Sequence, residues 1–308
     1  MTNLPSKYTK FYDLLLLIGY VSIGIMVGNF LSFAVGIALC QGNREAVHLL
    51  LETPHLFPEH RTTLLLMQAI NSLFVFLVMP LLYIRFSENA YQDVFDSKIS
   101  NVGLFLVIVF FLVISYFPLT AYLVKWNESW KLPDFLQEFE AKAKFSEEKI
   151  KKITEYLIDF QTPIELFLGF FVIAVLPGIG EELFFRGLLQ RTICKLLGNI
   201  HIAIWVTGFL FGAFHLQLYG IVPRMLLGVL FGYLYYWSGT LWISMWAHFL
   251  NNALTLLLMI ALSPHKELIF SESIESIENN PYSLFSLIGV GFMLLLFYRN
   301  SIQHKLPS

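Results

Sequence analysis

Several ionisable and amide side chains lie inside apolar stretches in the second half of this 308-residue chain. They are Glu181, Glu182, Arg186, His215, His248 and Asn252. Such side chains are unfavourable in lipid unless they are paired or face a polar cavity, so they mark candidate functional sites. A carboxylate and imidazoles in one cavity can activate a water molecule, and an imidazole with an amide can stabilise an oxyanion. The set is therefore typical of hydrolytic chemistry.

The two adjacent glutamates have different neighbours on a helix. Glu182 and Arg186 are four residues apart, so they share a helical face and can form an ion pair. Glu181 is rotated by about 100° from Glu182. It does not need to share the arginine, and we predict that it is free to act as a general base. The alternative is that Arg186 and Lys195 neutralise both carboxylates at the membrane interface.

His248 and Asn252 are also four residues apart and point the same way from one helix. Together they can hold a water molecule, a metal ion or a developing oxyanion. The alternative is a hydrogen-bonded pair that ties two helices together. His215, taken alone, is more typical of a histidine that is hydrogen-bonded in the protein interior.

The chain is much more apolar than an ordinary soluble domain, with 56% hydrophobic and 14% charged residues. Its apolar residues form runs of the length that a helix needs to cross a bilayer, roughly 20 residues. The sequence therefore predicts an all-α, multi-pass transmembrane helical bundle with about eight transmembrane helices. The predicted spans are 11–40, 63–84, 101–124, 161–179, 200–218, 223–238, 241–262 and 283–298. Proline and glycine predict a helix break at 177–180, after which 181–197 continues as a further helix or lies at the interface.

The segment 125–160 differs from the rest because lysines and glutamates alternate along it. Its second half predicts an amphipathic helix with Ser146 as N-cap and an apolar face that includes Ile153, Leu157 and Phe160. We expect this helix to lie on the membrane or on the protein itself, and a solvated linker is the alternative. The predicted parts are 1–124 with N-terminal transmembrane helices, 125–160 as the extramembrane segment, 161–262 as the catalytic core, and 263–308 as a loop and C-terminal transmembrane helix.

Charge and small residues give three further predictions. The net charge is −2 and the basic residues are scattered, which argues against a nucleic-acid partner. Glycines four residues apart, at Gly208 and Gly212 and at Gly228 and Gly232, predict close helix packing. Arg224 begins an apolar span and is predicted to reach a lipid headgroup.

Three ordered motifs resemble those of the CAAX protease and bacteriocin-processing family, also called the CPBP or Abi family. They are Glu181-Glu182-x-x-x-Arg186, Phe211-x-x-x-His215 and His248-x-x-x-Asn252, within residues 160–262. The resemblance implies an intramembrane hydrolase, a glutamic protease or a metalloprotease, that cleaves a peptide bond of a protein or peptide substrate, prenylated or not. Eukaryotic relatives remove the last three residues of prenylated CAAX proteins, and others are linked with bacteriocin maturation or self-immunity.

By this resemblance, Glu181 and His215 activate a water, while His248 and Asn252 stabilise the oxyanion or help to hold a metal. Glu182 and Arg186 are supporting residues. The cofactor is a divalent metal such as zinc, with Glu181, His215, His248 and Asn252 as ligands, or there is none. The protein is then a multi-pass protein in contact with membrane lipid, in the plasma or inner membrane if the chain is bacterial.

Two other classes of protein stay open from the residues. A non-catalytic membrane immunity or scaffold protein would keep the polar cluster for packing. A transporter would use the same residues to bind an ion, although the sequence has no detectable internal repeat of the kind many transporters have.

Overall fold

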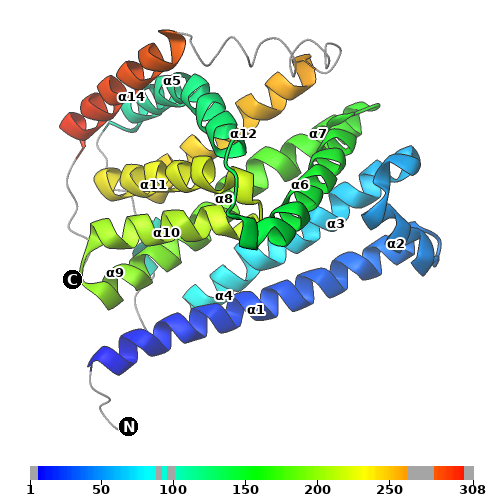
Figure 1. The fold of residues 1–308 in the computed structure, drawn as a ribbon. Coiled ribbons are helices and arrows are strands. Elements are labelled where there is room, and N and C mark those ends of the chain that lie inside the picture. Colours follow the sequence, from blue (N-terminus) through cyan, green and yellow to red (C-terminus); the bar gives the residue numbers. More distant parts are fainter. Residues whose placement is uncertain (1–5, 88–91, 96–100, 263–280, 302–308) are drawn as a thin grey trace.

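The computed structural model describes residues 6–87, 92–95, 101–262 and 281–301, and within these ranges it contains helices and no strand (Figure 1). The α-helices are α1 Ser6–Leu39, α2 Arg44–Glu52, α3 Arg61–Leu73, α4 Met79–Phe86, α5 Val102–Glu128, α6 Gln137–Ile158, α7 Pro163–Phe170, α8 Leu176–Glu182, α9 Arg191–Leu197, α10 Ile200–Phe214, α11 Ile221–Ser238, α12 Leu241–Leu262 and α14 Pro281–Asn300. The predicted all-α fold is confirmed.

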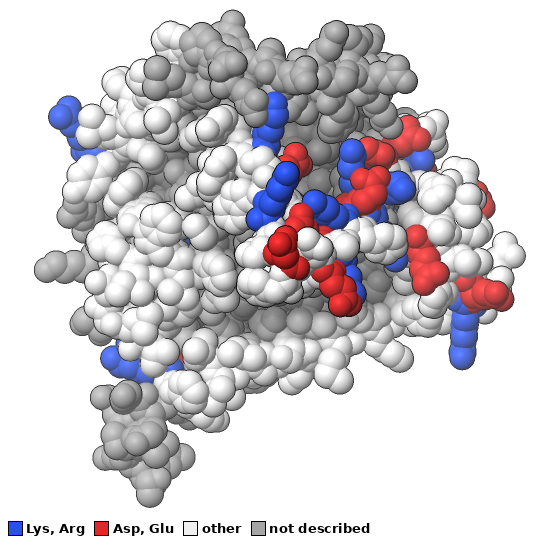
Figure 2. All heavy atoms as spheres, viewed as in Figure 1, with Lys and Arg blue, Asp and Glu red and all other residues white. Residues whose placement is uncertain are grey.

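Six helical segments are long and apolar enough to cross a membrane. They are Lys10–Leu39, Pro58–Phe86, Val102–Glu128, Pro163–Leu197, Leu218–Ser238 and Leu241–Ala261. Two shorter apolar helices, Ile200–Phe214 and Phe285–Asn300, correspond to the remaining predicted spans. Charged side chains gather over α6, whereas most of the rest of the visible face is uncharged (Figure 2). The protein is therefore an integral, multi-pass membrane protein; the predicted loop at 263–280 lies outside the described residues.

The predicted helix break at 177–180 is wrong, because one helical segment runs from Pro163 to Leu197. It passes through two π-helical stretches, η6 Phe171–Val175 and η7 Leu183–Gln190. Pro177 has no N–H to donate to the carbonyl of Ile173, four residues earlier, and the wider π-helical turn accommodates this loss. The Ile173 carbonyl instead accepts a hydrogen bond of 3.3 Å from Asn252 Nδ2 on α12.

A second proline, Pro118, lies inside α5 and is accommodated by a side chain from α14. Ser286 Oγ donates to the carbonyl of Ser115 and accepts a 3.2 Å hydrogen bond from the N–H of Leu119. The hydroxyl thus replaces the direct helical bond between these two backbone groups. The last helix of the chain is joined to α5 at this point.

Glycines set the close approach of the helices that carry the candidate site. A Cβ atom at Gly228 of α11 would lie 3.0 Å from the Cα atom of Gly208 of α10. A Cβ atom at Gly178 would lie 3.0 Å from the backbone nitrogen of Phe249 in α12. The packing role predicted for the paired glycines of α10 and α11 is confirmed, and Gly178 serves helix contact rather than a break.

The amphipathic helix α6 begins at Gln137, so the predicted N-cap at Ser146 is wrong. Ion pairs of 2.6 Å between Glu138 and Lys142 and between Glu140 and Lys144 span the turns before Ser146. Hydrogen bonds from Lys144 and from the N–H of Leu132 hold the pKa of Glu140 below its usual value, so this carboxylate is ionised at neutral pH. The predicted apolar face packs on the protein itself, because Leu157 is buried in a cluster that Ile153 and Phe160 also contact.

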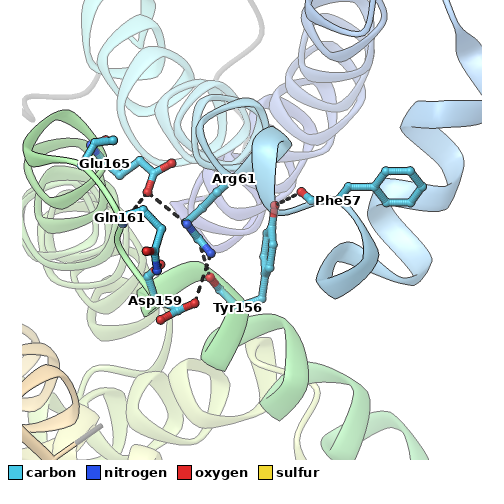
Figure 3. Close-up of polar contacts among 7 residues, drawn as sticks. Phe57, Arg61, Tyr156, Asp159, Gln161 and Glu165 are labelled. Carbon is cyan, nitrogen blue, oxygen red and sulfur yellow. Dashed lines mark hydrogen bonds and ion pairs between the residues drawn. The ribbon is translucent and has the colours of Figure 1, made fainter. Parts of the chain in front are cut away.

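One buried arginine fastens the end of α6 to the membrane helices (Figure 3). Arg61, at the start of α3, is only 2% exposed. It donates to the Tyr156 carbonyl at 2.8 Å, to Glu165 Oε2 at 3.0 Å and to Asp159 Oδ2 at 3.4 Å. The Tyr156 hydroxyl donates to the Phe57 carbonyl at 2.6 Å. These contacts join α3, α6 and α7.

Candidate active site

The centre of the candidate site is an ion pair that is fully removed from solvent. Arg186 Nη1 lies 2.5 Å from Glu182 Oε1, and neither side chain is exposed. Arg186 Nη2 donates to the Gly228 carbonyl of α11 at 2.8 Å. The ion pair predicted from the four-residue spacing is confirmed. The glycine carbonyl is a partner on another helix, so the spacing could not predict it.

Aromatic rings surround the arginine on its other sides. The Cζ atom of Arg186 lies 4.8 Å from the ring centroid of Phe211 and 5.3 Å from that of Phe231. A guanidinium is attracted to the face of an aromatic ring, and this contact partly replaces the hydration that the buried charge has lost. The Phe211-x-x-x-His215 motif thus supplies a ring to the arginine as well as a histidine.

His248 connects the ion pair to the second glutamate. Its Nδ1 atom lies 2.8 Å from Glu182 Oε1, and its Nε2 atom lies 3.9 Å from Glu181 Oε2. An ionised carboxylate only accepts hydrogen bonds, so Nδ1 carries a proton and donates it to Glu182. The imidazole is stacked on the Phe231 ring, with centroids 5.0 Å apart. Both contacts fix the ring so that Nε2 faces Glu181, whose side chain is 15% exposed.

His215 lies at the end of α10, beside the same aromatic ring. Its Nδ1 atom is 2.9 Å from the Phe211 carbonyl, which can only accept, so Nδ1 is the donor and Nε2 keeps a lone pair. The Phe211 ring contacts both imidazoles, with centroid distances of 5.3 Å to His215 and 5.6 Å to His248. Two histidines that are 33 positions apart are therefore neighbours of one phenylalanine.

Asn252, like His248, contacts the helical segment Pro163–Leu197, but at a different place along it. Its Nδ2 atom donates to the Ile173 carbonyl, and its Oδ1 atom accepts a 3.2 Å hydrogen bond from Asn251 Nδ2. The amide has a second N–H, which is not used in these two contacts. The structure thus brings Glu181, Glu182, Arg186 and His248 together and places His215 and Asn252 at the edge of this group.

The nitrogen and oxygen atoms of these side chains are of the kinds that can bind a metal. In the described part of the chain, no three His, Cys, Asp or Glu side chains are arranged so that they could hold a metal ion. A zinc site normally needs at least three protein ligands. The described His, Cys, Asp and Glu side chains do not form such a three-ligand group.

One residue with a prominent contact at the site was missed from the sequence, and another residue, Arg224, was given a different role. Phe231 stacks on His248, but an apolar residue in an apolar helix gives no signal of such a role. Arg224 does not extend away from the protein as the snorkelling prediction implies: its Nη2 atom donates to Gln217 Oε1 at 2.5 Å. Its position four residues after Gly220 was the available signal, because a glycine lets a long side chain fold back over it.

These features define a class of protein: a multi-pass helical membrane protein with an ionisable cluster buried in its bundle. Residues 163–254 match a family model described as type II CAAX prenyl endopeptidase Rce1-like. The match confirms the resemblance to CAAX proteases, and all three motifs lie inside it. The segment 163–254 is thus similar to CAAX-type membrane endopeptidases. No curated protein and no solved structure matched the chain.

Proposed function

We propose that the chain is an intramembrane endopeptidase in which Glu181 activates the attacking water. One observation carries the proposal. Glu182 is engaged by both Arg186 and His248, whereas Glu181 faces His248 Nε2 at 3.9 Å, which is longer than a hydrogen bond. The oxygens of Glu181 are therefore available to a water molecule beside an imidazole that is already oriented.

The reaction follows from these positions without a covalent intermediate. Glu181 removes a proton from water while the water oxygen attacks the carbonyl carbon of the scissile peptide bond. The Nε2–H of protonated His248 donates to the resulting oxyanion, and the carboxylate of Glu182 at Nδ1 stabilises the imidazolium. Glu181 then transfers its proton to the leaving nitrogen as the C–N bond breaks. A donor of this kind is worth about 10²–10³-fold in kcat.

His215 and Asn252 have secondary roles in this scheme. The Nε2 lone pair of His215 accepts a hydrogen bond from the attacking water and helps to orient it. The second N–H of Asn252 is the second donor to the oxyanion. Support for both roles comes from their motifs in the matched segment; their other contacts leave Nε2 and one N–H free.

We further propose that the reaction needs no metal, because the described His, Cys, Asp and Glu side chains do not form a three-ligand group. In this scheme Glu181, His215, His248 and Asn252 act as acid, base and hydrogen-bond donors rather than as zinc ligands. Elemental analysis of the purified protein and activity after treatment with a chelator test this. A stoichiometric metal together with loss of activity on chelation would contradict it.

One cleavage assay tests both the class of substrate and the role of Glu181 as general base. The purified full-length protein would be assayed with a fluorogenic, farnesylated peptide that ends in Cys-aliphatic-aliphatic-X, and with the same peptide lacking the prenyl group. Glu181→Gln is expected to lower kcat by about 10²–10⁴-fold, the usual contribution of a general base. Its unfolding temperature should stay near that of the wild type. Glu138→Gln, the same change at an exposed position, is the matched control.

Activity of the Glu181→Gln protein equal to the wild type would refute the proposed mechanism. A wild-type protein that cleaves neither peptide would favour the non-catalytic immunity or scaffold class. Cleavage of the unprenylated peptide alone would favour a substrate such as a bacteriocin precursor.

A further inference from the structure

Arg224, in the first turn of α11, has hydrogen-bond partners for only part of its guanidinium group. Its Nη2 atom donates to Gln217 Oε1, but its Nη1 atom is buried and has no hydrogen-bond partner among the described residues. The side chain folds back over Gly220, where a methyl group would overlap Nη1. A guanidinium donor that is buried without an acceptor is unfavourable. It is positioned to gain from an acceptor that the chain itself does not supply.

The charged neighbours of Arg224 place it between the amphipathic helix and the proposed base. Glu147 of α6 and Glu181 are the carboxylates that interact electrostatically with its guanidinium, and His215 is a further titratable neighbour. Glu147 Oε1 also accepts a 2.8 Å hydrogen bond from the N–H of Tyr219, which links α6 to the 3-10 helix Leu218–Gly220 before α11. Arg224 therefore lies on the side of the proposed site that α6 covers.

A carboxylate is the ligand that best matches such an arginine, because its two oxygens pair with two N–H groups of the planar guanidinium. An endopeptidase that cuts near the end of a chain meets a carboxylate at a fixed distance from the scissile bond. Glu181 is among the carboxylates that interact with Arg224, so a substrate carboxylate bound to Arg224 would fix how far from the chain end the base acts.

We propose that Arg224 binds the C-terminal carboxylate of the substrate and so sets where the peptide is cleaved. The proposal rests on the proposed endopeptidase function. The bound carboxylate supplies the missing acceptor for Nη1, and Gly220 is required because a larger residue would displace the guanidinium. A phosphate of a lipid headgroup offers similar oxygens, but it would give no dependence on the end group of a peptide.

The test measures peptide binding and not cleavage. Its result is therefore informative even if the protein is not a hydrolase. The full-length Glu181→Gln protein, in nanodiscs of neutral lipid, would be titrated with two fluorescent farnesylated peptides. They have the same Cys-aliphatic-aliphatic-X sequence and end in a free carboxylate or in an amide. We expect at least about tenfold tighter binding of the carboxylate peptide, as for a hydrogen bond to a charged group.

Adding Arg224→Gln to this protein should remove the preference and leave binding of the amide peptide unchanged. Arg224→Lys keeps the charge and should retain part of the preference, which separates recognition from folding. Arg44→Gln, at an exposed position in α2, is the matched control and should leave the preference intact.

Equal affinity for the two peptides, or a preference that survives Arg224→Gln, would overturn the proposal. Weaker binding of both peptides with Arg224→Gln only in nanodiscs that contain anionic lipid would overturn it in favour of a headgroup site. A carboxylate preference that depends on Arg224 in a chain whose wild type cleaves neither peptide would support the binding role and refute the hydrolase.

Discussion

Replacing Glu182 by glutamine keeps the shape of the side chain but leaves Arg186 as a buried charge without its counter-ion. Neither side chain of the pair is exposed, so solvent does not screen the loss. Removing one partner of a buried ion pair lowers the free energy of unfolding by about 3–5 kcal/mol. At the roughly 2 °C per kcal/mol typical of larger domains, the unfolding temperature should fall by about 6–10 °C. His248 also loses the carboxylate that orients it, so kcat should fall as well.

The measurement is thermal unfolding of the detergent-solubilised protein, followed with a dye that reacts with the free cysteines, Cys40 and Cys194. Glu138→Gln breaks an ion pair of 2.6 Å whose side chains are 86% and 73% exposed, and it should have no measurable effect. Glu182→Gln combined with Arg186→Met removes both charges and should be more stable than Glu182→Gln alone. A Glu182→Gln protein that unfolds at the wild-type temperature would refute this account of the pair.

Three further changes test contacts between helices. Asn252→Leu should lower the free energy of unfolding by about 1–3 kcal/mol, because it removes the side-chain donor to the Ile173 carbonyl; an unchanged unfolding temperature would contradict that role. Arg61→Met should release the end of α6 and speed hydrogen exchange at 150–160 while sparing α10, as mass spectrometry would show. Ser286→Ala removes the hydroxyl between two backbone groups of α5 and should destabilise the protein by about 1–3 kcal/mol; equal stability would mean that α5 accommodates Pro118 without this hydroxyl.

Contacts within one helix could be predicted from the sequence, because spacing alone determines them. The pairing of Glu182 with Arg186 follows from a separation of four residues, and so does the common direction of His248 and Asn252. The apolar runs likewise predicted each membrane helix. The family motifs identified the matched segment for the same reason, since each motif is local.

Contacts between helices could not be predicted in this way. The Gly228 carbonyl that accepts from Arg186 lies 42 positions away, and nothing in the spacing selects it. The expected break at Pro177 fails for the same reason, because the backbone group that the proline leaves without a donor is satisfied by Asn252 from α12. A proline predicts the loss of a bond in its own helix, and it says nothing about a replacement from elsewhere in the fold.

The carbonyl left without a donor by Pro177 has a mechanical consequence for the bundle. A helix that contains a proline can bend at that point. Here a hydrogen bond from Asn252 links this point to the neighbouring helix α12. Close backbone contact at Gly178 and Phe249 and the His248–Glu182 hydrogen bond lie along the same seam. The two helices that carry Glu181 and His248 are therefore linked at three neighbouring points, and these contacts hold the base and the imidazole in a fixed relative position.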